Sequence, residues 1–371
     1  MSSSPLPLLS LRNGHWFKLI CGASFQHLPA IRTLCLIYVL AGADCIDVAA
    51  DPAVIHAAQS GIEAAYALRQ SHRAIDPHSV WLMVSLNDGE DPHFRKATFD
   101  PAQCPSDCTQ PCVTICPAQA IAFSDPLHAG VIADRCYGCG RCLPICPVQH
   151  IETRSHSASP TQIDSFVQAG LVHALELHTQ VGHEVQFRQL WSKVQPMLPH
   201  LQVLAISCPD ANGVLDYLTD LYAFMQPLPC PLIWQADGRP MSGDIGDGAT
   251  RATINYGEKL LRSPLPGFVQ LAGGTNAHTV PKLGERRLLP SHPTPPGSTL
   301  GIAGIAYGSY ARSLLMDLQA QLEAQPQSSY RLEDYPDLLW EGVRRATALV
   351  SPLKIQAMVN IPESLPEYVQ H

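Results

Sequence analysis

Short apolar runs alternate with amphipathic stretches along most of this chain. Eight of the runs are almost entirely apolar and are bounded by polar or turn residues, a pattern that predicts strands buried on both faces. These runs are Phe17 to Cys21, Cys45 to Ala49, Val80 to Leu86, Val172 to His178, Val203 to Cys208, Leu232 to Ala236, Phe268 to Ala272 and Leu300 to Ala306.

Between the predicted strands, several windows carry apolar residues at helical spacing. They are Leu28 to Leu40, Pro52 to Gln70, His183 to Val194, Asn212 to Met225 and Thr250 to Leu261. Regular alternation of strand and helix predicts an α/β fold with a parallel sheet covered on both faces, and eight such units favour a (β/α)8-type barrel. A Pro-rich stretch, Val280 to Thr299, replaces the seventh helix in this interpretation, and Tyr335 to Ala348 predicts a terminal helix.

Eight of the thirteen cysteines interrupt this pattern in two runs after the third predicted strand. The second run has the spacing C-x2-C-x2-C-x3-C-P, which is typical of two-cluster ferredoxins, in which the fourth cysteine ligates the cluster built mainly by the other run. Each run ends in Cys-Pro, followed by a Gln and an Ile, so the repeat is internal. One predicted ligand set is Cys136, Cys139, Cys142 and Cys116, and the other is Cys104, Cys108, Cys112 and Cys146.

The spacing predicts two [4Fe–4S] clusters in a ferredoxin-like insertion. The first run is wider, C-x3-C-x3-C-x3-C, so its cluster could instead be [3Fe–4S] or hold labile iron. Structural zinc is the rival interpretation, but no histidine stands at finger spacing. We assign residues 1–88 to the first barrel units, 89–158 to the insertion, 159–325 to the remaining barrel units, and 326–371 to a C-terminal helix and tail.

An insertion that follows a strand leaves from the carboxyl-end face of a barrel, where active sites are built. Glycine turns fall on the same face, with Gly273 and Gly274 after the seventh strand and Gly304, Gly308 and Ser309 with the eighth. Barrels often bind phosphate after their last two strands, because bare backbone N–H groups face the anion there. These residues therefore form a candidate site for a flavin or another phosphate-bearing ligand, and simple turn geometry is the alternative.

Among the polar residues near the strand ends, Asp47 and Glu176 differ from the rest because each lies among apolar residues. A carboxylate there must be paired or protonated, which makes both candidates for a catalytic site. His178 could shuttle protons or could be a hydrogen-bonded core residue. Lys18 could attract an anionic ligand or pair with Asp47. Asp51, directly before Pro52, is predicted to cap a helix.

Composition narrows the function classes. The net charge of -8, without clusters of Lys or Arg, argues against nucleic acid as a partner. The longest apolar run, Leu34 to Ala43, is too short to span a bilayer, and the N-terminus has no signal-peptide pattern, so we expect a cytoplasmic protein. Common hydrolase, kinase and dinucleotide-binding motifs are missing.

The chain resembles the cyanobacterial light-dependent period protein family. The resemblance rests on the stretches Phe17 to Gln26, Ala41 to Pro52 and Gln270 to Asn276 and on the two cysteine runs, and it covers roughly Phe17 to past Ser309. It implies an iron–sulfur protein that adjusts the circadian period to light through the redox state of the cell. It further implies that the eight cysteines are cluster ligands and that the partners are clock proteins, including clock-input kinases. It supplies no enzymatic reaction.

Two hypotheses follow. In the first, a regulatory protein exchanges electrons with soluble carriers, and the state of its clusters alters a surface that clock proteins recognise. In the second, the insertion feeds electrons to a flavin or substrate at the barrel mouth. The sequence favours the first, because no catalytic constellation stands out from ordinary structural roles.

Overall fold

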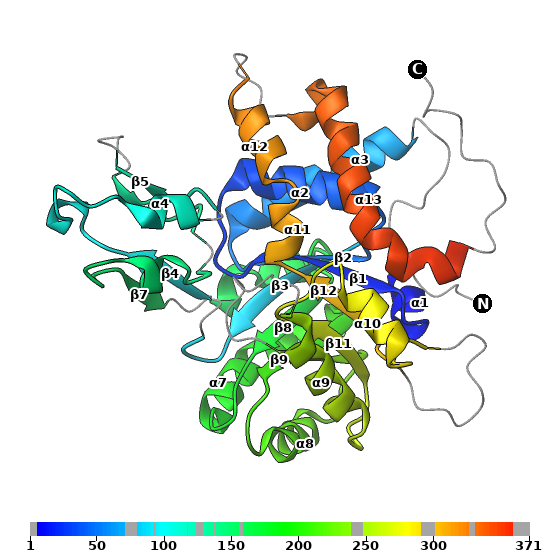
Figure 1. Cartoon of the computed structure of the whole chain (residues 1–371). Helices are drawn as coiled ribbons and strands as arrows, with labels where there is room; N and C mark the ends of the chain where they lie inside the picture. Colours follow the sequence, from blue (N-terminus) through cyan, green and yellow to red (C-terminus); the bar gives the residue numbers. More distant parts are fainter. Residues whose placement is uncertain are drawn as a thin grey trace.

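Eight parallel strands close into a barrel in the computed structural model (Figure 1). The strands are β1 (Trp16–Gly22), β2 (Cys45–Ala49), β3 (Trp81–Asn87), β8 (Ala174–His178), β9 (Val203–Pro209), β10 (Leu232–Asp237), β11 (Phe268–Ala272) and β12 (Gly304–Tyr307), and their order around the barrel is β1-β12-β11-β10-β9-β8-β3-β2. Each overlaps a predicted strand, so the predicted barrel is confirmed.

The structure describes residues 6–70, 80–91, 94–116, 118–123, 129–136, 138–155, 159–238, 248–290, 301–325 and 331–358. Parts of the predicted Pro-rich connection, of the segment closing the insertion, of the eighth strand and of the C-terminal tail lie outside these residues.

Helices cover the outer face of the barrel, because the segments between its strands carry apolar residues at helical spacing. They are α2 (Leu28–Leu40), α3 (Pro52–Gln70), α6 (Asp164–Gln168), α7 (Glu184–Val194), α8 (Val214–Met225), α9 (Thr250–Leu261), α10 (Thr279–Glu285), α11 (Ser309–Ser313), α12 (Met316–Glu323) and α13 (Pro336–Met358). Two expectations need correction: the start of the Pro-rich connection forms α10, and the terminal helix continues past Pro352.

The amino end of the barrel is closed by apolar side chains. Trp16 and Trp81 meet edge to face with ring centroids 5.7 Å apart, and Met83 and Ile233 pack beside them. Leu11, in the short helix α1 (Leu6–Arg12), belongs to the same buried cluster. Water is therefore excluded from this end, and the opposite, carboxyl end is left to form a site.

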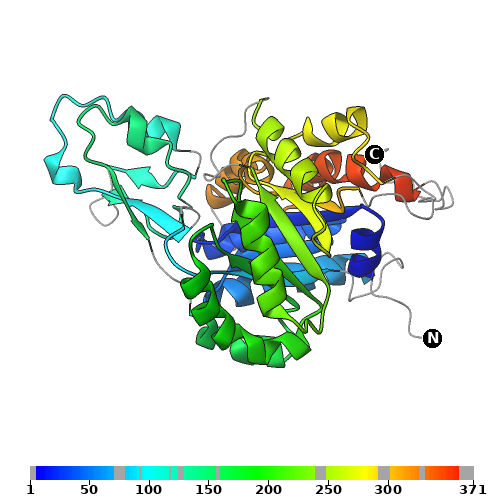
Figure 2. The ribbon, with the colours of Figure 1, turned by 90° about the horizontal axis from the view of Figure 1, so that it is seen from below.

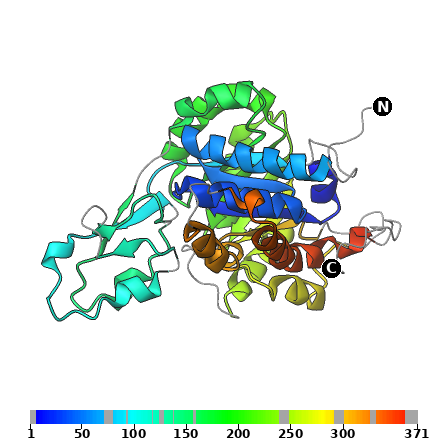
Figure 3. The ribbon, with the colours of Figure 1, turned by 90° about the horizontal axis from the view of Figure 1, so that it is seen from above.

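The cysteine-rich insertion leaves the barrel after β3 and returns before β8. It contains β4 (Arg95–Thr98), α4 (Pro111–Ile115), β5 (Ile121–Ala122), β6 (Gly130–Val131), α5 (Cys142–Ile145) and β7 (Glu152–Ser155). The antiparallel pairing of β4 with β7 places the start and the end of the insertion side by side, and we call this two-stranded pair the stem. Figures 2 and 3 show this cysteine module projecting from the barrel, on the side away from α1.

Polar contacts hold the module against the barrel. The backbone N–H of Gln26, in the loop after β1, donates to the carbonyl of Asp134 at 2.9 Å, and Lys96 Nζ donates to Gln26 Oε1 at 2.7 Å. Arg135 pairs with Glu323 at the end of α12, at 3.0 Å. These contacts join the residues beside Cys136 to two elements of the barrel.

Candidate functional site

The two cysteine runs share a local backbone conformation. Cys116 follows α4 at φ -72° and ψ 108°, and Cys146 follows α5 at φ -68° and ψ 116°. Three residues later Gln119 and Gln149 are both left-handed, at φ 48° and 52°. Their N–H groups donate to the carbonyls of Cys116 and Cys146 at 3.2 and 3.1 Å. The repeat seen in the sequence is thus a repeat in structure, as a pseudo-twofold module requires.

The thiols of the module gather in two sets. Burial raises the pKa of Cys142, and the neighbours that raise it further are Cys139, Cys136 and Cys116. Burial also raises the pKa of Cys112, with further contributions from Cys104 and Cys146. Burial likewise raises the pKa of Cys104, with further contributions from Cys108 and Cys146. The electrostatic neighbours of these thiols thus connect three cysteines of each run with the last cysteine of the other, which is the pairing that crossed ligation requires.

A cavity marks the position of one set. It has a volume of about 410 Å³, open solvent included, and is lined by Cys116, Cys136, Cys139 and Cys142. The rest of its wall is almost wholly apolar, from Ala97, Ala118, Ala120, Ile121, Val131 and Leu143 among others. Four thiols around a mostly apolar cavity, with no carboxylate among the described residues of its wall, suit an iron–sulfur cluster, which is held by Cys thiolates.

Backbone N–H groups point at the sulfur atoms. Ala120 N lies 3.2 Å from Cys116 Sγ, and Ala97 N lies 3.4 Å from Cys136 Sγ. Such donors favour the charged thiolate and tune the potential of a bound cluster. A histidine that the sequence did not single out, His150, places Nε2 3.8 Å from Cys104 Sγ. His150 follows Cys146 of the second run, whereas Cys104 begins the first run. Only the crossed arrangement of the two runs could have indicated that these residues meet.

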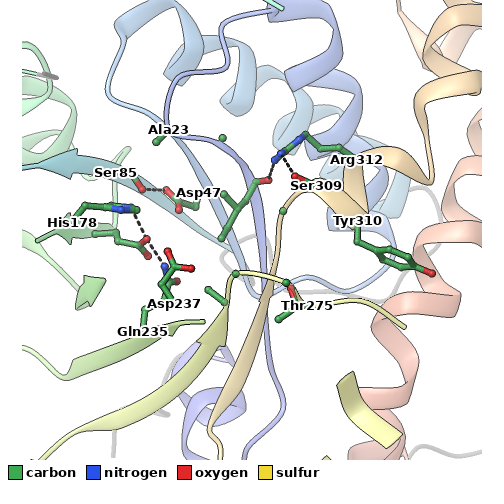
Figure 4. A pocket seen from close by; sticks show the side chains of 17 residues that line it. Ala23, Asp47, Ser85, His178, Gln235, Asp237, Thr275, Ser309, Tyr310 and Arg312 are labelled. Atoms are coloured by element: carbon green, nitrogen blue, oxygen red, sulfur yellow. Dashed lines mark hydrogen bonds and ion pairs between the residues drawn. The ribbon is translucent and has the colours of Figure 1, made fainter. Parts of the chain in front are cut away.

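A second candidate site lies at the carboxyl-end mouth of the barrel (Figure 4). This pocket encloses about 650 Å³, open solvent included. Its polar lining comes from Asp47, Ser85, Glu176, His178, Gln235, Asp237, Thr275, Ser309 and Arg312, all of them buried. The structure therefore brings together Asp47, Glu176 and His178, which the sequence marked as candidates. Ser85 and Arg312 were missed, although Ser85 interrupts the apolar run of β3.

Beneath the pocket, a chain of polar side chains crosses the barrel interior. Lys18 is 0% exposed and pairs with Glu176 and, at 3.4 Å, with Asp47. Gln235 Nε2 donates to Glu176 Oε1 at 2.7 Å, and Ser85 Oγ donates to Asp47 Oδ1 at 2.8 Å. Each buried charge thus has partners, as burial in a low-dielectric interior demands.

The two carboxyl groups have opposite pKa shifts. Burial raises the pKa of Asp47 to about 6, although Lys18 opposes the shift. Burial also acts on Glu176, but Lys18 and a hydrogen bond from His178 outweigh it and lower its pKa to about 2. Carboxyl groups whose environments separate their pKa values are the usual arrangement of an acid–base pair.

His178 links this network to the stem of the cysteine module. Its Nε2 lies 2.9 Å from Glu176 Oε1, and its Nδ1 lies 3.3 Å from Asp91 Oδ2. Burial alone would lower the pKa of His178, but Asp91 and Glu176 raise it well above its usual range. The ring also packs edge to face on Phe94, with centroids 5.3 Å apart. Asp91 and Phe94 precede β4, so His178 connects the pocket with the module.

The opposite wall of the pocket carries the glycine turns. Gly273, Gly274, Gly308 and Ser309 all line it. Gly274 has φ +90°, and a Cβ there would lie 2.7 Å from the carbonyl oxygen of Ala249, so packing alone requires glycine at this position. Gly304 lies elsewhere: it begins β12 near the amino end, where a Cβ would collide with Trp16.

Other polar residues near the strand ends have structural partners. Asp51 caps α3, accepting from the N–H groups of Ala53 and Val54 at 2.9 and 3.2 Å, as predicted. Asp88 lies 2.9 Å from His183 Nδ1, and exposed Asp210 pairs with Lys259 at 2.7 Å. None of the three lines the mouth pocket.

The raised pKa of Asp47 predicts a pH effect on stability. Its pKa is above the ordinary value of 3.8, so the folded state binds the proton more tightly than the unfolded state. That contribution to stability is complete below pH 3.8 and is lost as the pH rises through about 6. Asp47→Asn should therefore flatten this decline, as measured by urea unfolding across the acidic to neutral range. Exposed Asp210→Asn is the control, and equal pH dependence in wild type and Asp47→Asn would contradict the shift.

The likeness of this chain to a solved structure is weak. Among the described residues, no helix is long and apolar enough to cross a membrane. The chain is similar to tryptophan synthase from M. tuberculosis in its aminoacrylate-bound form, with a TM-score of 0.39 and 10% identity over 94% of this chain and 98% of that one. A likeness this low supports no conclusion.

The similarity in sequence is much stronger. The LdpA Fe-S cluster-binding domain model matches residues 104–157, and the Light dependent period A C-terminal domain model matches residues 166–352. Light dependent period A of Synechococcus elongatus is 49% identical over 368 residues, which cover 99% of each chain. The matched residues include all eight cysteines of the module, and the chain therefore belongs to the light dependent period A family.

Proposed function

We propose that this protein is a redox-sensing regulator that carries two [4Fe–4S] clusters in its ferredoxin-like module and adjusts the circadian period to light. The observation that carries the proposal is the cavity lined by Cys116, Cys136, Cys139 and Cys142, which joins three cysteines of the second run to the last cysteine of the first. A [3Fe–4S] cluster in the set with Cys104 is the variant that its wider spacing allows. The clusters would supply one-electron transfer with soluble carriers in the cytoplasm.

The protein's own residues offer a way to transmit the state of the module. Arg135 precedes Cys136 and pairs with Glu323 of α12, and His27 Nε2 lies 3.7 Å from the same carboxylate. A change of charge at Cys136 alters the field at Arg135, so the docking of the module on the barrel depends on it. Clock proteins, including clock-input kinases, are the partners we propose for the surface formed here.

A cellular experiment tests this function. Replacing Cys136, Cys139 and Cys142 together by Ser should abolish the light dependence of the circadian period, because the set loses three of its four ligands. Cys230→Ser, which changes a half-buried cysteine outside the module, is the matched control. Period measured at several light intensities gives the result. Normal tuning in the triple variant, with its iron content shown to be reduced, would reject the proposal.

A second candidate function is supported by the mouth pocket: an oxidoreductase in which the module feeds electrons to a flavin or another phosphate-bearing ligand. The supporting observation is that Gly273, Gly274, Gly308 and Ser309 line one pocket with Asp47 and Glu176. Asp47→Asn separates the two candidates. It should spare period tuning if the clusters alone sense redox state, and it should impair tuning at full iron content if a ligand at the mouth takes part. Flavin absorbance in anaerobically purified protein is the direct check.

A further inference from the structure

The mouth pocket has two chemically different walls. Asp47, Ser85, His178, Gln235 and Asp237 stand on one side, and Ser309 and Arg312 stand on the other (Figure 4). The first wall carries carboxylates, and the second carries a guanidinium group. A ligand that fits both must therefore present different groups at its two ends.

Asp47 is the carboxylate best placed to receive a ligand group. Glu176 is held by three partners, Lys18, Gln235 and His178. Asp47 accepts one close hydrogen bond, from Ser85, and its other oxygen lies 3.4 Å from Lys18. A carboxylate offers about four lone-pair sites, so Asp47 retains the capacity to accept from a hydroxyl group in the pocket.

Arg312 provides the positive wall. It is 6% exposed, and its Nη1 donates to the backbone carbonyls of Ile20 and Cys21 at 2.6 and 2.9 Å. Its Nη2 donates to Ser309 Oγ at 3.1 Å. These contacts fix the guanidinium at the wall of the pocket, and an arginine side chain stays charged in proteins. A guanidinium held this way suits an anionic group such as phosphate or carboxylate.

A purely structural role explains this arrangement less well. Buried ion pairs stabilise a fold little compared with apolar packing of similar volume, and such packing does fill the amino end of the same barrel around Trp16 and Trp81. At the carboxyl end, polar residues instead face a cavity. Polar residues that converge on a concave site at this end of a barrel are the usual signature of ligand binding.

We infer that the barrel mouth binds a small polyol that carries one anionic group, with its hydroxyl groups at Asp47 and its anion at Arg312 and Ser309. The inference rests on the second candidate function only in taking the mouth to be a ligand site, and it is independent of the clusters.

Calorimetric titration of the iron-loaded protein tests the inference with four probes. Glycerol 3-phosphate and glycerate each combine the two groups, whereas inorganic phosphate and glycerol each carry one. At least one combined probe should bind about ten-fold more tightly than either single-group probe, because it contacts both walls. The comparison of glycerol 3-phosphate with glycerate tells which anion the Arg312 wall prefers. Equal affinity for combined and single-group probes would overturn the inference.

Variants locate the binding. Asp47→Asn keeps the size of the side chain and should weaken the preferred combined probe about ten-fold, because a charged acceptor is lost. Asp210→Asn, at an exposed pair outside the pocket, should leave affinity unchanged. If Asp47→Asn fails to fold, Ser309→Ala on the opposite wall serves instead and should weaken binding several-fold. Undiminished affinity in the folded variant would place the ligand elsewhere and refute the assignment. Iron content and cluster spectra, recorded on the same samples, report on the iron–sulfur function separately.

Discussion

Replacing Cys116 by Ser should remove the same cluster as replacing Cys139, although these residues belong to different runs. Both line one cavity with Cys136 and Cys142, whereas the cysteines next to Cys116 in its own run belong to the other set. Iron in anaerobically purified protein should fall from about eight to about four atoms per chain in either variant. Electron paramagnetic resonance of the reduced protein should lose the same signal in both.

Cys112→Ser is the matched comparison, because it lies only one turn from Cys116 but faces Cys104 and Cys146. It should remove the other signal and spare the one lost with Cys116. Cys230→Ser should keep all the iron. If Cys116→Ser and Cys112→Ser removed the same signal, ligation would follow the runs along the sequence, and the crossed arrangement would be wrong. Stoichiometric zinc in place of iron would reject the cluster proposal altogether.

The barrel could be predicted from the sequence because the pattern that defines each of its strands is local. An apolar run bounded by turn residues defines a buried strand without reference to distant parts of the chain, so Cys45–Ala49 and Phe268–Ala272 were predicted to the residue. The same holds for the helix Thr250–Leu261. Predictions that depended on composition alone were weaker. The Pro-rich segment was predicted to lack a helix, but α10 forms at its start because Pro281 lies in the first turn, where a helix tolerates proline.

The candidate site was only partly predictable, because its geometry comes from closure of the barrel. Lys18 and Glu176 are 158 positions apart and meet only when β1 and β8 face each other across the interior. The sequence left open whether Lys18 attracts an anionic ligand or pairs with Asp47, and the structure shows the pair with Asp47 and adds Glu176 as a closer partner. Gly274 and Gly304 looked equivalent as turn glycines. Their surroundings separate them, because Gly274 lies at the mouth and Gly304 packs under Trp16.

Loss of the charge on Lys18 should destabilise the barrel more than any surface substitution. Although burial by itself lowers the pKa of Lys18, Glu176 and Asp47 raise it above the ordinary lysine value, so the ammonium group stays charged. Lys18→Met preserves most of the volume but leaves two carboxyl groups without their shared cation. Breaking a buried pair from one side costs about 3–5 kcal/mol, which should lower the melting temperature by roughly 5 °C in a chain of this length.

Lys259→Met provides the comparison, because Lys259 makes a single pair with Asp210 and both side chains are more than a third exposed. A pair of this kind contributes at most about 1 kcal/mol. Adding Glu176→Gln to Lys18→Met should recover part of the lost stability, since it removes one of the stranded charges. Thermal unfolding of the four proteins at neutral pH decides the matter. If Lys18→Met melted at the same temperature as the wild type, the ammonium group would not be the cation that holds Glu176 ionised, and the opposite pKa shifts of Asp47 and Glu176 would need another cause.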